Sequence, residues 1–180
     1  MIRFNCMKIV LASALFPPDI APPAPYLKEL AHRLAQTHDV TAVVYGHLPE
    51  KVEGVRVVAI SKRRALALRL VAYTVALWRA ARRADLVFLE NGASVELPAL
   101  IVSSVTKTPI LIHFGDRTAK KYFYHKALMR RVADTIEESP LPRPEILPFE
   151  PRPEAAFAAY ESSWHHHLAA LDKKFTDAKK

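Results

Sequence analysis

The sequence predicts an α/β fold in which about five parallel strands form a single doubly wound, Rossmann-like sheet. Short apolar runs alternate with segments of helical periodicity from residue 8 to residue 138. These runs are too apolar for strands with one solvated face, and they are typical of parallel strands that helices cover on both sides. A chain of 180 residues with 51% hydrophobic residues suffices for one domain with an ordinary core. Right-handed crossovers then predict the strand order 3-2-1-4-5.

The N-terminal part contains three predicted strands and one predicted helix. Residues 8–15 form the first apolar run. Leu27, Leu30, Ala31 and Leu34 recur on one side of residues 24–36, which indicates an amphipathic helix. Residues 39–45 (DVTAVVY) and 55–60 (VRVVAI) are the second and third strands, and Gly46 ends the second.

Two further strands are predicted at residues 85–89 (DLVFL) and 109–114 (PILIHF). The intervening and following segments, residues 62–83, 94–106 and 118–138, are predicted helices. Helix 62–83 is unusual because its apolar arc is wider than a helix on a sheet needs, with a narrow face that carries Arg69, Arg79 and Arg83. Three explanations stay open: the headgroup region of an anionic membrane, a partner-chain interface, or packing in the core with arginines reaching outward.

The sequence changes character after residue 138, so we expect three parts: a Rossmann-like domain at residues 1–138, a Pro-rich strap at 139–153, and a C-terminal helix with a charged tail at 154–180. Six prolines exclude a helix from the strap. Ile146, Leu147 and Phe149 lead us to expect that it docks on the domain; a flexible linker is the alternative. Residues 154–175 are the predicted helix, and residues 173–180 a frayed tail.

The net charge of +8 is concentrated in two stretches without acidic residues, 61–84 and 117–131. An anionic partner would explain them, namely lipid headgroups, a nucleotide or polyprenyl diphosphate, or nucleic acid; solvated helix faces are the alternative. Nucleic acid is the least expected, because no helix-turn-helix, zinc or aromatic-rich module is visible.

The single Cys6 excludes an internal disulfide and favours the cytoplasm. We expect no signal peptide and no membrane-spanning helix, and either Met1 or Met7 as the start.

In such folds ligands bind at the carboxyl ends of the strands, where the strand order reverses. The loops expected to meet there are residues 16–23, 90–94 and 115–118. The candidate catalytic residues are His113 and Asp116, which could orient or deprotonate an acceptor hydroxyl. Acids, amides, glycines and basic side chains of the same loops are candidates for substrate binding; they are Asp19, Glu90, Asn91, Gly92, Ser94, Gly115, Arg117 and Lys120. Ser94 is a candidate N-cap, and Arg117 and Lys120 could hold a phosphate.

Each candidate has a structural alternative. Asp19 could serve merely to cap its loop, and Glu90 merely to pair with a neighbouring helix. His113 could be a core histidine on the same face of the sheet as Leu111. Residues 165–167 are three consecutive histidines. Because they point about 100° apart in a helix, they cannot ligate one metal ion together, and we expect them on a solvated face. No metal site is expected.

The segment PPDIAPPAPYLKELAHRLAQTHDVTAVVYG resembles the start of the N-terminal, acceptor-side domain of GT-B-fold glycosyltransferases of family 4. The matching features are a Pro-Pro-acid loop, a helix that ends in Leu-Ala, and the residues that lead into the next strand. The matching residues are Pro17, Pro18, Asp19, Glu29, Leu30, Ala31, Leu34, His38 and Val40. The resemblance covers roughly residues 7–116. It implies the acceptor-binding half of an enzyme that uses a nucleotide-sugar donor without a metal, in a cleft between two similar domains. No cofactor is then expected on this chain alone.

The sequence departs from this family in three respects. Ala21, Pro22 and Pro23 stand where the family has a Gly-Gly pair, and the prolines offer no N–H to a phosphate. The family's strand-end histidine aligns with Gly115, two residues after His113. The 180 residues leave no room for a donor-binding domain. We therefore expect either a separate donor-binding chain or a non-catalytic binding or scaffold module, cytoplasmic and peripheral to the inner face of the membrane.

Overall fold

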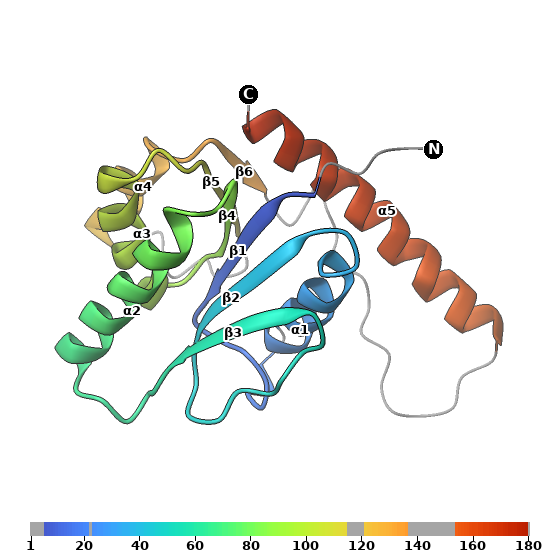
Figure 1. Ribbon diagram of the computed structural model, residues 1–180, viewed down its shortest axis with the longest axis horizontal. Coiled ribbons are helices and arrows are strands. Elements are labelled where there is room, and N and C mark those ends of the chain that lie inside the picture. The colour runs from blue at the N-terminus through green and yellow to red at the C-terminus, as the bar shows by residue number, and fades with distance from the viewer. Residues whose placement is uncertain (1–5, 22, 115–120, 137–153, 180) are drawn as a thin grey trace.

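A parallel sheet with the strand order β3-β2-β1-β4-β5-β6 forms the centre of the computed structural model (Figure 1). The structure describes residues 6–21, 23–114, 121–136 and 154–179. The strands are β1 (Lys8–Ser13), β2 (Asp39–Tyr45), β3 (Val55–Ile60), β4 (Leu86–Glu90), β5 (Ile110–His113) and β6 (Asp134–Ile136). The helices are α1 (Pro23–Leu34), α2 (Leu66–Ala81), α3 (Ala93–Val105), α4 (Phe123–Met129) and α5 (Glu154–Ala178). The predicted doubly wound sheet and its order are confirmed, with one strand added at the edge.

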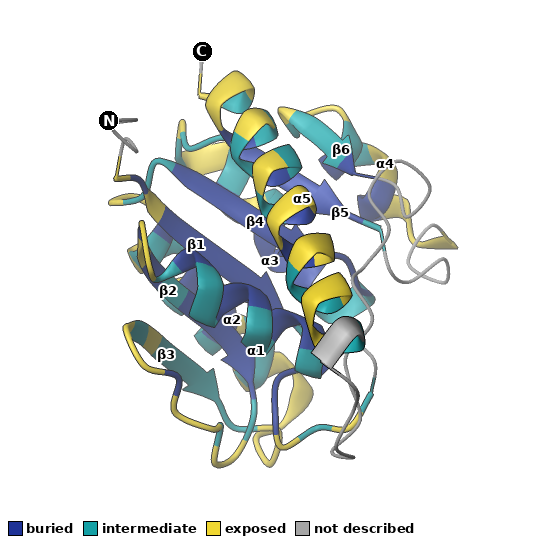
Figure 2. Cartoon of the chain, turned by 90° about the vertical axis from the view of Figure 1, so that its right-hand side faces the viewer, coloured by how far each residue is buried: buried dark blue, intermediate teal, exposed yellow. Residues whose placement is uncertain are grey.

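Helices cover both faces of the sheet, which explains why its strands are apolar throughout (Figures 1 and 2). Ile9 and Leu11 of β1 belong to a buried cluster with α1 and α5. Their neighbours Val10 and Ala12 belong to a second cluster with α2, α3 and α4. This alternation follows from the two-residue period of a strand.

The sixth strand corrects the predicted helix at residues 118–138. Within the described residues, the helix is confined to α4, and the chain turns after it through a hydrogen bond from Arg131 N to Leu128 O. Residues 134–136 then pair in parallel with β5, with Thr135 opposite Ile112 and Ile136 opposite His113. Pairing with an open sheet edge therefore overrides a local pattern that reads as helix.

Other boundaries also differ from the prediction, and a local cause is visible at three of them. The strand β1 ends at Ser13 because its hydroxyl bonds both the N–H and the C=O of Leu15 and turns the chain. The helix α2 starts at Leu66, after a turn in which the N–H groups of Arg63 and Arg64 bond Ser61. The helix α3 follows Gly92, and Ser94 makes no capping hydrogen bond, so the predicted N-cap is wrong.

The C-terminal helix α5 crosses the α1 side of the sheet and ends at Ala178, so the predicted frayed tail is wrong (Figure 2). Leu171 and Phe175 are completely buried against the sheet. Lys174 Nζ lies 2.5 Å from Asp134 Oδ2, and Lys179 Nζ lies 2.8 Å from Asp85 Oδ1. Buried apolar area and ion pairs thus hold the last turns in helical form. The Pro-rich strap at 139–153 lies outside the described residues.

Candidate functional site

The carboxyl ends of β4 and β5 bring two of the predicted site residues together. The parallel register places Glu90, the last residue of β4, opposite His113, the last residue of β5. The two side chains meet, with 2.7 Å between His113 Nδ1 and Glu90 Oε2. The carboxyl group that was expected either to bind substrate or to pair with a helix pairs instead with the imidazole of the adjacent strand.

Both members of this pair are enclosed by the protein, since the exposed fraction is 2% for Glu90 and 0% for His113. The His113 ring lies between aromatic rings, with centroids 5.8 Å from that of Tyr26 and 6.0 Å from that of Phe88. His113 therefore lies on the α1 and α5 side of the sheet, on the side predicted from its alternation with Leu111. The hydrogen bond between Glu90 and Nδ1 holds the imidazole ring in one orientation.

A cluster of aromatic and imidazole side chains continues from His113 into α1 and α5. The Tyr26 hydroxyl lies 2.8 Å from His167 Nε2, and the Tyr26 ring stacks on Trp164 at 5.9 Å. His167 is 5% exposed, so the predicted solvated face is wrong for this histidine. Its position was available from the sequence, because His167 shares a helical stripe with Trp164, Leu171 and Phe175.

The loop after β1 directs Asp19 away from this pair. Asp19 Oδ2 accepts a hydrogen bond from the N–H of Phe16 at 3.3 Å and lies 2.6 Å from Nζ of Lys62, two residues after β3. Asp19 thus closes its own loop, as its structural alternative stated, and forms an ion pair that was not predicted. The N–H of Ala24 donates to Ala21 O within the same loop.

The segment after β4 lies directly beside the Glu90 and His113 pair. Asn91 is 5% exposed, and its N–H donates to His113 O at 3.0 Å, which continues the pairing of β4 with β5 beyond the side-chain pair. Gly92 has an extended backbone, and a methyl group there would make ordinary contacts with Ala14 and Val95, so the fold itself does not require glycine. Ser94 contributes its carbonyl oxygen, which accepts a hydrogen bond from the Tyr45 hydroxyl.

A second buried acid and imidazole pair lies on the opposite face, between α3 and α4. His125 Nδ1 is 2.9 Å from Glu96 Oε2, and the exposed fractions are 7% and 0%. Sequence reasoning missed this pair, although an acid in the otherwise apolar segment ASVELPALIV was a signal. The Tyr124 hydroxyl donates to Ala93 O and ties α4 to the start of α3.

The remaining predicted residues, Gly115, Asp116, Arg117 and Lys120, lie outside the described residues. Within the described ranges, no group of three or more His, Cys, Asp or Glu side chains is arranged to hold a metal ion. The described part of the site therefore consists of the His113 imidazole paired with the Glu90 carboxylate, the backbone of the segment after β4, and the ion pair between Asp19 and Lys62.

The sequence matches no protein-family model and no curated protein. A solved structure with a similar course of the chain is the crystal structure of HepE from Anabaena in complex with UDP. The sequence identity is 14%, the similarity covers 72% of this chain and 37% of that chain, and the TM-score is 0.46. This chain therefore spans little more than a third of the length of that structure.

Proposed function

We propose that this chain is the acceptor-side domain of a glycosyltransferase and acts with a separate donor-binding chain that supplies the nucleotide-sugar. One observation carries the proposal: Glu90 and His113 meet at the carboxyl ends of neighbouring parallel strands, the edge where doubly wound folds bind ligands. The resemblance of residues 7–116 to the acceptor-side domain of family 4 glycosyltransferases agrees with this position.

The burial of His113 determines the role that we propose for it. A ring with no exposed surface does not reach a substrate, so His113 acts as a positioning residue that fixes the end of β5 through Glu90. Asp116, three residues further along the chain, is then the candidate that deprotonates the acceptor hydroxyl. Asp19, with its partner Lys62, is proposed to border the acceptor, and Arg117 and Lys120 to hold a phosphate.

A second candidate function is a non-catalytic binding or scaffold module, and two observations favour it. The Glu90 and His113 pair is enclosed between Tyr26 and Phe88, as a purely structural pair would be. In the loop after β1, the N–H of Ala24 bonds a carbonyl of the same loop, and Pro23 has no N–H, so the loop offers few groups to a phosphate.

The two functions are distinguished by isolating the tagged chain with its natural partner and supplying labelled nucleotide-sugars. A glycosyltransferase complex transfers label to an acceptor, and Asp116→Asn lowers the rate at least about 100-fold, the usual contribution of a general base. The control is His125→Asn, which breaks the buried pair with Glu96 on the other face and leaves the rate per folded complex unchanged. A scaffold transfers no label from any donor, yet retains its partner in all of these variants.

We further propose that the protein is cytoplasmic and lies at the inner face of the membrane. The structure supports a surface role for α2, because only Tyr73, Leu77 and Ala81 of this helix are buried. Leu66, Leu68 and Val71 are between 61% and 64% exposed, so packing in the core does not account for the wide apolar arc. Among the described residues, no helix is both long and apolar enough to cross a bilayer. Flotation with phosphatidylcholine vesicles, with and without phosphatidylglycerol, tests this localisation.

A further inference from the structure

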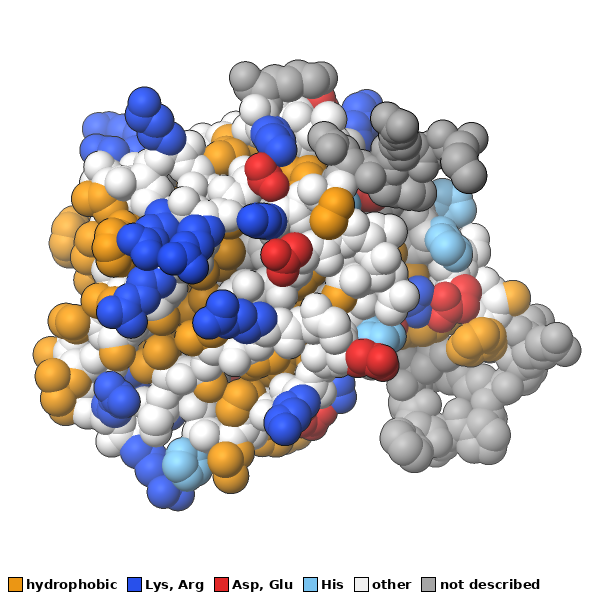
Figure 3. Space-filling model, viewed as in Figure 1, with side chains coloured by type: hydrophobic (Ala, Val, Ile, Leu, Met, Phe, Trp, Pro, Cys, Tyr) orange, Lys and Arg blue, Asp and Glu red, His pale blue; other side chains and the backbone are white. Residues whose placement is uncertain are grey.

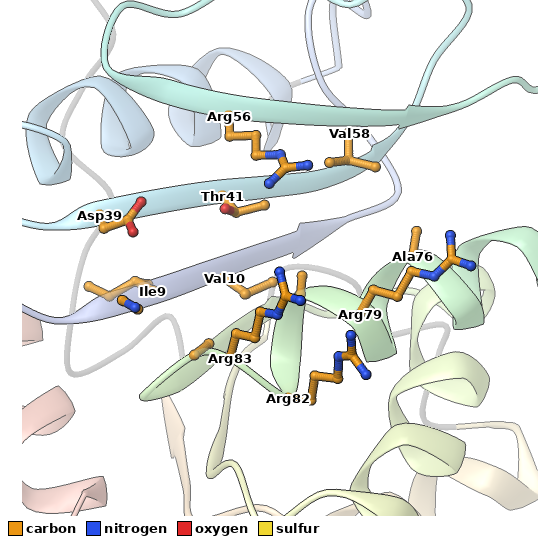
Figure 4. Close-up of a pocket in the computed structure, with 13 residues that line it drawn as sticks. Ile9, Val10, Asp39, Thr41, Arg56, Val58, Ala76, Arg79, Arg82 and Arg83 are labelled. Carbon is orange, nitrogen blue, oxygen red and sulfur yellow. The ribbon is translucent and has the colours of Figure 1, made fainter.

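A groove of about 520 Å³ opens at the amino ends of the strands, whereas the candidate site lies at their carboxyl ends (Figure 4). Lys8 and Asp39 are the first residues of β1 and β2, and Arg56 is the second residue of β3, so the groove lies at the amino ends of these strands. The end of α2 and the connection to β4 close its other side. Its lining residues are Lys8, Ile9, Val10, Asp39, Thr41, Arg56, Val58, Ala76, Arg79, Ala80, Arg82, Arg83 and Ala84.

The lining is strongly basic, with four arginines and one lysine against the single carboxylate of Asp39. Among the described residues, the ion pairs use other cations, and none of the four groove arginines faces a carboxylate at ion-pair distance. Arg82 instead lies over the Trp78 ring at 4.9 Å. Figure 3 shows basic and apolar side chains interspersed on this part of the surface.

The arginines approach the groove from two elements that are far apart in the sequence. Arg56 extends from β3 and Arg83 from the segment after α2, and the two side chains approach the region of Thr41 and Val10 from opposite sides (Figure 4). Arg82 lies beside Arg83. Like charges that converge without an acidic partner repel one another, and an anion that enters between them removes this repulsion.

We propose that this groove binds a phosphate-bearing ligand between Arg56 and Arg83. A guanidinium group presents paired N–H donors that match two oxygens of one phosphate, and two such groups on opposite sides suit a diphosphate or a phosphodiester. The Thr41 hydroxyl on the floor adds a neutral donor. The groove lies at the opposite edge of the sheet from Glu90 and His113, so the proposal does not depend on glycosyl transfer.

The first experiment titrates the full chain with inorganic pyrophosphate and follows binding by calorimetry at low ionic strength. The double variant Arg56→Gln/Arg83→Gln should bind at least about tenfold more weakly, because each substitution removes a charge-assisted contact. The matched control Arg130→Gln/Arg131→Gln removes the same charge from two exposed residues after α4 and should bind as the unmodified chain does. Asp39→Asn should strengthen binding, since it removes the one carboxylate of the lining.

The second experiment identifies the source of the phosphate by flotation with phosphatidylcholine vesicles, with and without phosphatidylglycerol. Binding that requires phosphatidylglycerol and is lost in Arg56→Gln/Arg83→Gln assigns the groove to lipid phosphates. Pyrophosphate binding without vesicle binding assigns it to a soluble phosphate compound and contradicts the proposed membrane localisation. The groove proposal is overturned if neither probe binds, or if the double variant and its control bind both probes equally well.

Discussion

At the scale of single residues, the register of two parallel strands decides the chemistry of the candidate site. Opposite residues in neighbouring parallel strands place their side chains on the same face, so Glu90 and His113 meet without any loop to position them. The same placement puts them under Tyr26, where no solvent reaches the imidazole. A buried pair of this kind is worth more as a unit than either group alone, because removing one member leaves the other without its partner.

The strength of this coupling can be measured with a double-mutant cycle. Glu90→Gln and His113→Asn should each lower the free energy of unfolding by about 1–3 kcal/mol, the cost of leaving a buried polar group without its partner. The double variant should lose at least about 1 kcal/mol less than the sum of the two, since the pair is lost only once. Urea unfolding of the four chains measures these values. Additive losses would contradict a coupled pair.

At the scale of elements, several contacts between charged or titratable groups join α5 to the rest of the molecule. Two of them, Lys174 with Asp134 and Lys179 with Asp85, hold its end. Nearer its start, Arg33 of α1 makes two hydrogen bonds to Glu161, at 2.9 and 2.7 Å, and lies over the Trp164 ring. A further contact joins His38 Nε2 to Asp172 Oδ1, at 3.3 Å.

These contacts change the pKa values of three carboxyl groups. Hydrogen bonds from Arg33 lower the pKa of Glu161 below its ordinary value of 4.5. The bond from Lys179, with the N–H of Lys8, lowers the pKa of Asp85 below 3.8. Burial acts to raise the pKa of Asp134, but the bonds from Lys174 and from the N–H of Thr135 lower it overall. The ion pairs that attach α5 therefore favour the ionised carboxylates.

We predict that acid weakens the attachment of α5. A carboxyl group whose pKa is lowered in the folded state stabilises that state above its unfolded pKa, and this stabilisation is lost as the pH falls through the folded pKa. The loss should begin below about pH 4.5, the unfolded value for Glu161. Urea unfolding monitored by tryptophan fluorescence between pH 7 and pH 2.5 measures it.

Glu161→Gln tests the cause of this acid effect. The variant should be less stable than the unmodified chain at pH 7, and the difference should shrink as the pH falls toward 2.5 and Glu161 takes up a proton. Glu53→Gln, at an exposed position outside the ion pairs described above, should match the unmodified chain at every pH. A constant difference for Glu161→Gln across this range would show that the effect is not due to ionisation.

At the scale of the whole molecule, α5 completes the core on one side of the sheet. The buried cluster that contains Ile9 and Leu11 of the central strand also contains Trp164, Leu171 and Phe175 of α5. The candidate site and the arginine groove lie at opposite edges of the sheet. The proposed phosphate-bearing ligand and the proposed donor-binding chain would therefore not compete for the same surface.

Two aromatic side chains of α5 allow a matched test of whether this helix contributes to the core. Trp164→Ala should lower the free energy of unfolding by about 3–5 kcal/mol, because it leaves a cavity at a position with no exposed surface. Phe157→Ala, on the same helix but 57% exposed, should change it by less than about 0.5 kcal/mol. Thermal and urea unfolding of both variants decide the matter. Equal effects would mean that α5 is not part of the cooperative core.

Much of the fold could be predicted because the strands are local patterns. The segments at 39–45 and 55–60 occupy the predicted boundaries as β2 and β3. The sixth strand could not be predicted, since residues 134–136 become a strand only by pairing with β5. In the candidate site, Glu90 and His113 were predicted singly, but their pairing depends on register; the inward position of His167 was readable from the stripe it shares with Trp164 and Phe175.

The sequence by itself determined the parallel α/β sheet and its strand order, because hydrophobic periodicity and crossover handedness act locally. Only the tertiary structure decided which side chains meet, since the partners are far apart along the chain: 23 residues separate Glu90 from His113, and 141 separate Tyr26 from His167. The groove lined by arginines also depends on the tertiary structure, because Arg56 and Arg83 come together only when β3 and the end of α2 pack side by side.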